Sequence, residues 1–182
     1  MKNLDILLQK YAKLIVEVGA NVQKDQRVVV SCSTDNNKFA RLVTKEAYNV
    51  GAKEVIINWY DDEVSLLDVL NQSVETYSEV PNHLVERYRY FVSENVCFIH
   101  ITSEVPGIFK DADSKKLMAS RIARHEKLQF YNDHVMSNGT QWTIGAVPNP
   151  VWAKKVFPNA KTDEEAVSLL WDAILKASRV TI

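Results

Sequence analysis

Four short apolar runs alternate along the sequence with segments whose apolar residues recur every three or four positions. Such runs are typical of strands buried on both faces, and the recurring spacing is typical of amphipathic helices. The runs span residues 27–32, 54–60, 96–102 and 140–147. Because helices between strands imply crossover connections, the sequence predicts an α/β fold. We expect a doubly wound, mainly parallel sheet of at least four strands with helices on both faces, Rossmann-like or flavodoxin-like.

The helical segments carry start and stop residues that support this division. The first pattern covers residues 4–18, and Gly51 is a plausible end of the second. We expect one long helix from about 113 to 132, and a last helix that Thr162 and Glu165 open as a capping box. Residues 1–182 are therefore expected to form a single α/β domain.

The charge balance and the cysteines indicate where the protein resides and which partners it is not expected to bind. The 22 basic and 23 acidic residues give a net charge of −1, which argues against a nucleic acid or an anionic membrane as partner. Asp5, Gln9 and Lys10 interrupt the segment that a signal peptide would need. Cys32 and Cys97 lie in apolar runs and are expected to be buried hydrophobes rather than a disulfide. We therefore expect a cytoplasmic protein with no nucleic-acid and no membrane partner.

Polar side chains follow each predicted strand. Ligands of open α/β sheets bind at the carboxyl ends of the strands, so Asp35, Asp61 and Glu104 are candidate residues of a crevice that holds a cation or a peptide amine. The same ends also suit another role. Thr34, Asp35, Asp61 and Asp62 are typical caps of the helices that follow, and both interpretations stand open.

The search for motifs assigns no catalytic residue and no metal ligand. The segment "SCSTDNN" after the first strand has no glycine, so it lacks the close backbone approach of a dinucleotide or phosphate loop. The four histidines do not have the spacing of a metal site, and no nucleophile elbow is present. The bottom-up expectation is an α/β domain without a visible catalytic centre.

The segment "QWTIGAVPNPVWAKKVFPNA" over residues 141–160 concentrates bulky and stiff residues. Its alternation predicts the end of the fourth strand, where Gly145 permits a close backbone approach, followed by a short helix between prolines. The residues that we take as its structural signature are Trp142, Pro148, Pro150, Trp152 and Phe157.

The order of these residues resembles the amino-terminal half of the aminopeptidase T and aminopeptidase S family, the thermophilic-type metalloaminopeptidases. The segments "LLQKYAKLIVEVGANVQKDQRVVV", "FARLVTKEAYNVGAKEVIINWYDDE", "FIHITSEVPGIF" and "TDEEAVSLLWDAIL" are similar to the same family. The resemblance covers residues 4–180, essentially the whole chain.

The resemblance implies an exopeptidase that releases amino-terminal residues from peptides with two divalent metal ions, zinc, cobalt or similar. Such a pair polarises the scissile carbonyl and lowers the pKa of a bridging water. In the family the ligands belong to a carboxy-terminal catalytic domain, which this chain lacks, so no catalytic residue and no metal ligand is carried over. The implied role is that of an amino-terminal, non-catalytic domain cut near its linker. Its implied partners are its own carboxy-terminal domain, peptide substrates and a second copy in a homodimer.

Two other interpretations stay open. The chain could be a freestanding α/β module that binds a small-molecule amine through Asp35, Asp61 and Glu104. It could also be an interaction domain, with an apolar face left bare by a missing partner domain.

Overall fold

The computed structural model describes residues 3–181 and contains one parallel sheet. Its strands run in the order β2-β1-β3-β4. This is the order of flavodoxin-like doubly wound folds, and it confirms the predicted fold class. Because β2 lies on one side of β1 and β3 on the other, the winding reverses between β1 and β3. The strand bounds are β1 (Arg27–Ser33), β2 (Glu54–Tyr60), β3 (Cys97–Thr102) and β4 (Trp142–Ala146).

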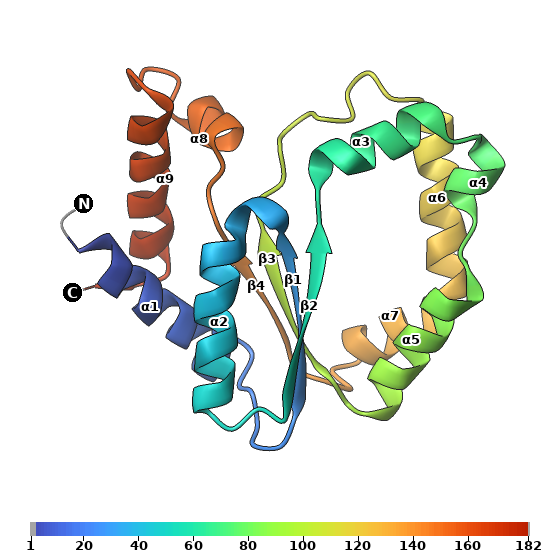
Figure 1. The fold of residues 1–182 in the computed structure, drawn as a ribbon, viewed down its shortest axis with the longest axis horizontal. Coiled ribbons are helices and arrows are strands. Elements are labelled where there is room, and N and C mark those ends of the chain that lie inside the picture. The colour runs from blue at the N-terminus through green and yellow to red at the C-terminus, as the bar shows by residue number, and fades with distance from the viewer. Residues whose placement is uncertain (1–2, 182) are drawn as a thin grey trace.

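One group of helices covers one face of the sheet (Figure 1), and the main hydrophobic core lies on that side. Tyr11, Phe39 and Trp171 bring three helices together there, with ring centroids 5.5 to 6.3 Å apart. A Cβ at Gly145 would lie 2.5 Å from the Ile15 Cδ1 atom, which confirms the predicted close approach. The helices of this side are α1 (Leu4–Leu14) with its π-helical continuation η1 (Ile15–Gly19), α2 (Asn37–Asn49), α8 (Pro150–Val156) and α9 (Asp163–Ala177).

The second face of the sheet is covered near the amino ends of its strands. Phe91 of α5 and Tyr131 of α7 pack against Phe98 of β3, with ring centroids 6.0 and 5.2 Å away. The other helices of this side form an arc that stands away from the sheet (Figure 1). The bounds are α3 (Asp62–Asn71), α4 (Val74–Ser78), α5 (Asn82–Ser93), α6 (Ser114–Lys127) and α7 (Gln129–Met136).

The expectation of one helix over residues 113–132 is wrong. The chain leaves helical geometry at Leu128, where φ is −109° and ψ is 18°, so α6 ends and α7 begins on either side of that residue. The Leu128 side chain is buried. The bend turns α7 so that Tyr131 and Val135 reach the second face of the sheet, where they join the small aromatic cluster around Phe98.

Both cysteines are buried and unpaired, which confirms the expectation drawn from their apolar runs. Cys32 lies on β1 and Cys97 on the neighbouring β3. Burial raises the pKa of the Cys32 thiol to about 11 and that of Cys97 to about 12. Among residues 3–181, no helix has the length and apolar character that a membrane crossing needs.

Candidate functional site

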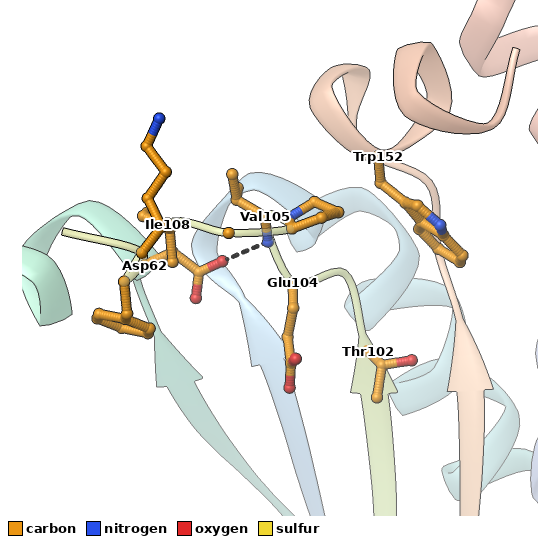
Figure 2. A pocket seen from close by; sticks show the side chains of 10 residues that line it. Asp62, Thr102, Glu104, Val105, Ile108 and Trp152 are labelled. Carbon is orange, nitrogen blue, oxygen red and sulfur yellow. Dashed lines mark hydrogen bonds between the residues drawn. The ribbon is translucent and has the colours of Figure 1, made fainter. Parts of the chain in front are cut away.

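A cavity of about 540 Å³ lies at the carboxyl edge of the sheet. Its wall combines the end of β3 (Thr102), the start of α3 (Asp62), Trp152 of α8 and the loop 104–110 (Figure 2). Since ligands of open α/β sheets bind at this edge, the cavity is the candidate functional site.

Asp62 fixes one side of the cavity loop. Its carboxylate accepts a hydrogen bond of 2.9 Å from the N–H of Val105, which ties the loop to the first turn of α3. Figure 2 shows this bond, with the Glu104 side chain pointing from the loop back toward the strands beside Thr102. The two carboxylates therefore have different roles, because Asp62 positions the backbone whereas Glu104 faces the open space.

Asn149 fixes the other side of the same loop. Its Nδ2 donates to the carbonyl oxygens of Ser103 and Glu104 at 2.7 and 3.0 Å, and its Oδ1 accepts the N–H of Trp152 at 2.8 Å. Asn149 is thus the N-cap of α8, with Pro150 in the first turn. One residue of the proline-rich segment, Asn149, thus both starts α8 and anchors the cavity loop.

The signature residues serve this arrangement in different ways. Trp152 lines the cavity, and with Phe157 it packs against the small cluster between α8 and α9. Pro148 is buried in the connection from β4 to α8. Trp142, in contrast, is 39% exposed on β4 and takes no part in the cavity.

The three predicted crevice residues occupy three different environments. Glu104 lines the cavity. Asp61 caps α3, because one oxygen accepts the N–H groups of Glu63 and Val64 at 3.0 Å, and the other accepts the Thr34 hydroxyl. Asp35 is exposed in the short 3₁₀ turn η2 (Thr34–Asn36) and does not line the cavity. The capping interpretation thus describes Asp61, while Ser33 rather than Thr34 caps η2.

Sequence reasoning placed Asp62 at the carboxyl ends of the strands but did not select the loop 105–110 as part of the site. The Pro106–Gly107 turn is the local signal that was available, because such a pair ends regular structure. Gly107 has a φ of +85°, in the left-handed region that favours glycine. The hydrogen bond between Asp62 and Val105 joins residues 43 positions apart, so no local sequence pattern predicts it.

Hydrogen bonding and burial shift the pKa of groups around the site in opposite directions. The N–H of Val64, and then the Thr34 hydroxyl, lower the pKa of Asp61 below its usual range. Burial raises the pKa of Tyr60, whose hydroxyl donates to the Ile101 carbonyl oxygen at 3.1 Å. Burial lowers the pKa of His100, so its imidazole is neutral at pH 7.

The residues of this site do not fit a metal pair. Throughout residues 3–181, no three His, Cys, Asp or Glu side chains are grouped so that they could bind a metal together. At the cavity, Asp62 and Glu104 stand without a histidine or cysteine in the wall. The wall offers the Glu104 carboxylate and hydrogen-bonding groups, which are suited to a cationic or hydrogen-bonding ligand.

Comparisons with known proteins agree over nearly the whole chain. Aminopeptidase AmpS of Bacillus subtilis (strain 168) is 42% identical over 173 residues, which are 95% of this chain and 42% of the relative. Aminopeptidase PepS of Streptococcus thermophilus is 37% identical over the same shares. The structure of wild-type AmpT from Thermus thermophilus superposes with a TM-score of 0.87 at 26% identity, over 96% of this chain and 44% of that one.

The chain therefore spans less than half of the length of these relatives. Residues 4–182 match the family described as thermophilic metalloprotease (M29). The matched span, the parallel sheet and the superposition on AmpT agree, and this chain belongs to the M29 family of thermophilic metalloproteases.

Proposed function

We propose that this chain is the amino-terminal, non-catalytic domain of a metal-dependent aminopeptidase that releases amino-terminal residues from peptides. In this proposal the two divalent ions, zinc, cobalt or similar, are held by a carboxy-terminal domain outside these residues. The intact protein would be a cytoplasmic homodimer that acts on peptide substrates.

The observation that carries the proposal is the mismatch of lengths. Relatives named aminopeptidases match 95% of this chain but only 42% of their own length. A second observation supports the division of labour, because the groups that could bind a metal are not clustered within residues 3–181. A hydrolase that depends on metal needs such a cluster, so the proposal assigns it to the remainder of the protein.

The direct test is an activity and metal-binding assay on the 182-residue chain. With leucine 4-nitroanilide and Co²⁺ or Zn²⁺, the chain is expected to release no 4-nitroaniline, and calorimetry is expected to show no tight metal pair. The B. subtilis relative, assayed beside it, is the positive control. Release of 4-nitroaniline by the chain, dependent on metal and abolished by EDTA, would contradict the non-catalytic assignment.

The size of the native product tests the other half of the proposal. An antibody against this chain should detect, in the source cells, a band far heavier than 20.7 kDa. A band at 20.7 kDa, with no heavier precursor in a pulse-chase experiment, would refute the assignment to a longer aminopeptidase.

A freestanding binding module is the second candidate, and the cavity beside Glu104 is the observation that favours it. Such a module would bind a small amine in the 182-residue form, so a screen of amines by thermal shift should raise its melting temperature. Glu104→Ala should abolish that rise without lowering the melting temperature of the free protein. The absence of any stabilising amine would remove this candidate.

A further inference from the structure

The second face of the sheet changes from apolar to polar along its strands. Near the amino ends it is apolar, and α5 and α7 cover it around Phe98. Closer to the carboxyl ends, three neighbouring strands present Asn58, Ser31 and His100 side by side, since Ser31 is in register with both of the others. This polar row, Asn58–Ser31–His100, lies where the interior of a doubly wound sheet is usually apolar.

The side-chain polar groups of the row make no hydrogen bonds within the described part of the fold, although the His100 ring stacks on Phe98 with ring centroids 6.4 Å apart. All three are half-buried, and the hydrogen bonds found among residues 3–181 do not involve them. They are also not among the buried polar atoms that lack a partner in that range, so their polar atoms reach solvent. A fully buried, unpaired polar group is costly, which means that the row suits a wet surface rather than a dry interface.

The polar row lies at the place where this fold class binds ligands. Ser31 belongs to β1 and His100 to β3, and the strand order reverses between these two strands. In doubly wound sheets the ligand crevice forms outside the carboxyl ends of such a pair. On β3 the same face continues from His100 to Thr102, which already lines the cavity.

The charge of the cavity complements a cation. Among residues 3–181, neither Asp62 nor Glu104 forms an ion pair. Lys110 is the basic residue of the wall, and its ammonium lies 3.9 Å from the carboxylate of Asp111. The Glu104 carboxylate, which points back toward the strands beside Thr102 in Figure 2, is therefore available to a positively charged group.

The hydrogen-bonding groups of the polar row complement an amide chain. A carboxamide, a hydroxyl and a neutral imidazole can each both donate and accept, as the N–H and C=O groups of a peptide require. Burial keeps the His100 imidazole neutral at pH 7 by lowering its pKa. A bound chain could thus lie over the row with its charged end at Glu104.

We propose that the open sheet face formed by Ser31, Asn58 and His100, together with Glu104, binds the amino-terminal part of a peptide. Glu104 pairs with the protonated α-amino group, and the polar row bonds to main-chain amides. The inference deepens the proposed function and rests on it for the identity of the ligand as a peptide.

The test is an NMR titration of the ¹⁵N-labelled 182-residue chain with trialanine and with N-acetyl-trialanine, each up to about 20 mM, a range suited to an exposed and shallow site. Trialanine is expected to shift the amide signals around Ser31, Asn58, His100 and Glu104. The acetylated peptide should bind about fivefold more weakly, the effect of losing one partly exposed ion pair. Shifts confined to other regions, or none with trialanine, would overturn the proposal.

Two variants separate the roles of the two parts, and a third serves as control. Glu104→Gln should weaken the binding of trialanine about fivefold and leave the binding of the acetylated peptide unchanged. Ser31→Ala should weaken the binding of both peptides alike, by about twofold to fivefold, because one hydrogen bond is lost. Asp35→Asn, a change at an exposed carboxylate outside the cavity, should leave both affinities unchanged. Equal binding of the two peptides by the unmodified chain would refute the role of Glu104.

Dilution tests whether a second copy covers this face instead. If the signals of the polar row shift when the unliganded protein is diluted, a copy of the chain occupies the face and the proposal is overturned. The proposed function is tested separately by activity and native size. If the native product is longer but the 182-residue chain does not bind trialanine, only this inference is refuted. If the chain binds peptide but the native product is 20.7 kDa, only the peptidase assignment is refuted.

Discussion

The Tyr11 hydroxyl bonds to both main-chain groups of Ala146. It accepts the N–H of Ala146 at 2.9 Å and lies 3.3 Å from the carbonyl oxygen of the same residue, to which it donates. Ala146 ends β4, which is an edge strand, so no further strand satisfies these groups. One buried side chain from α1 thus closes the sheet edge just before the chain turns toward the cavity loop.

Tyr11→Phe should lower the free energy of unfolding by about 1–3 kcal/mol, because it leaves the N–H of Ala146 without its partner in a poorly hydrated place. Urea denaturation followed by circular dichroism measures the loss. Tyr48→Phe is the matched control, since the Tyr48 hydroxyl also accepts a main-chain N–H, from Val55 at 3.3 Å, but Tyr48 is 51% exposed. Water can replace that bond, so equal losses in the two variants would contradict the explanation.

The two thiols should be inert in the folded protein. Burial raises the pKa of Cys32 to about 11 and of Cys97 to about 12, so neither forms the reactive thiolate at pH 8. With Ellman's reagent at pH 8, the native chain should show no rapid reaction. In 8 M urea both thiols should react within minutes. A rapidly reacting thiol in the native state would mean that β1 or β3 is accessible.

The strands were predictable because their signals are local. The apolar run over residues 54–60 coincides with β2, and Asp61 directly after it caps α3. Trp142 and Ile144 alternate on β4 as expected, but they are 39% and 59% exposed, outside the cluster that α5 and α7 form around Phe98. A single sequence shows the alternation of apolar residues along a strand, but it does not show which of them a helix will bury.

The strand order, the end of α6 and the composition of the cavity could not be predicted from local patterns. Leu128 looks like any apolar helix residue, and only the contacts of Tyr131 with the sheet explain why the chain bends there. The tie between Asp62 and Val105 depends on how two distant segments pack. For the same reason the sequence grouped Asp35 and Asp61 with Glu104, although only Glu104 lines the cavity.

The stability of the fold should depend on pH through His100. Its folded pKa is lowered by burial from an ordinary value of 6.5, so the unfolded chain binds more protons in the window below that value. The contribution of His100 is therefore fully present above about pH 6.5 and is lost as the pH falls through the lowered folded pKa. Urea midpoints between pH 7.5 and 5 should fall less steeply for His100→Asn than for the unmodified chain. His125→Asn, at an exposed position, should leave the slope unchanged.

Asn149→Ala should be the most destabilising of the capping changes. Asn149 is 7% exposed and makes three hydrogen bonds, to Ser103, Glu104 and Trp152, so its loss leaves buried main-chain groups unpaired. We expect a loss of about 2–4 kcal/mol in the free energy of unfolding. Thr162→Ala, which removes a single exposed cap bond of 3.2 Å at α9, should cost about 1 kcal/mol. Asn149→Asp keeps the acceptor for Trp152 but places an oxygen against two carbonyls, so it should not restore the lost stability. Denaturation curves of all three variants check this order, and a loss in Asn149→Ala no larger than in Thr162→Ala would show that the loop does not depend on this anchor.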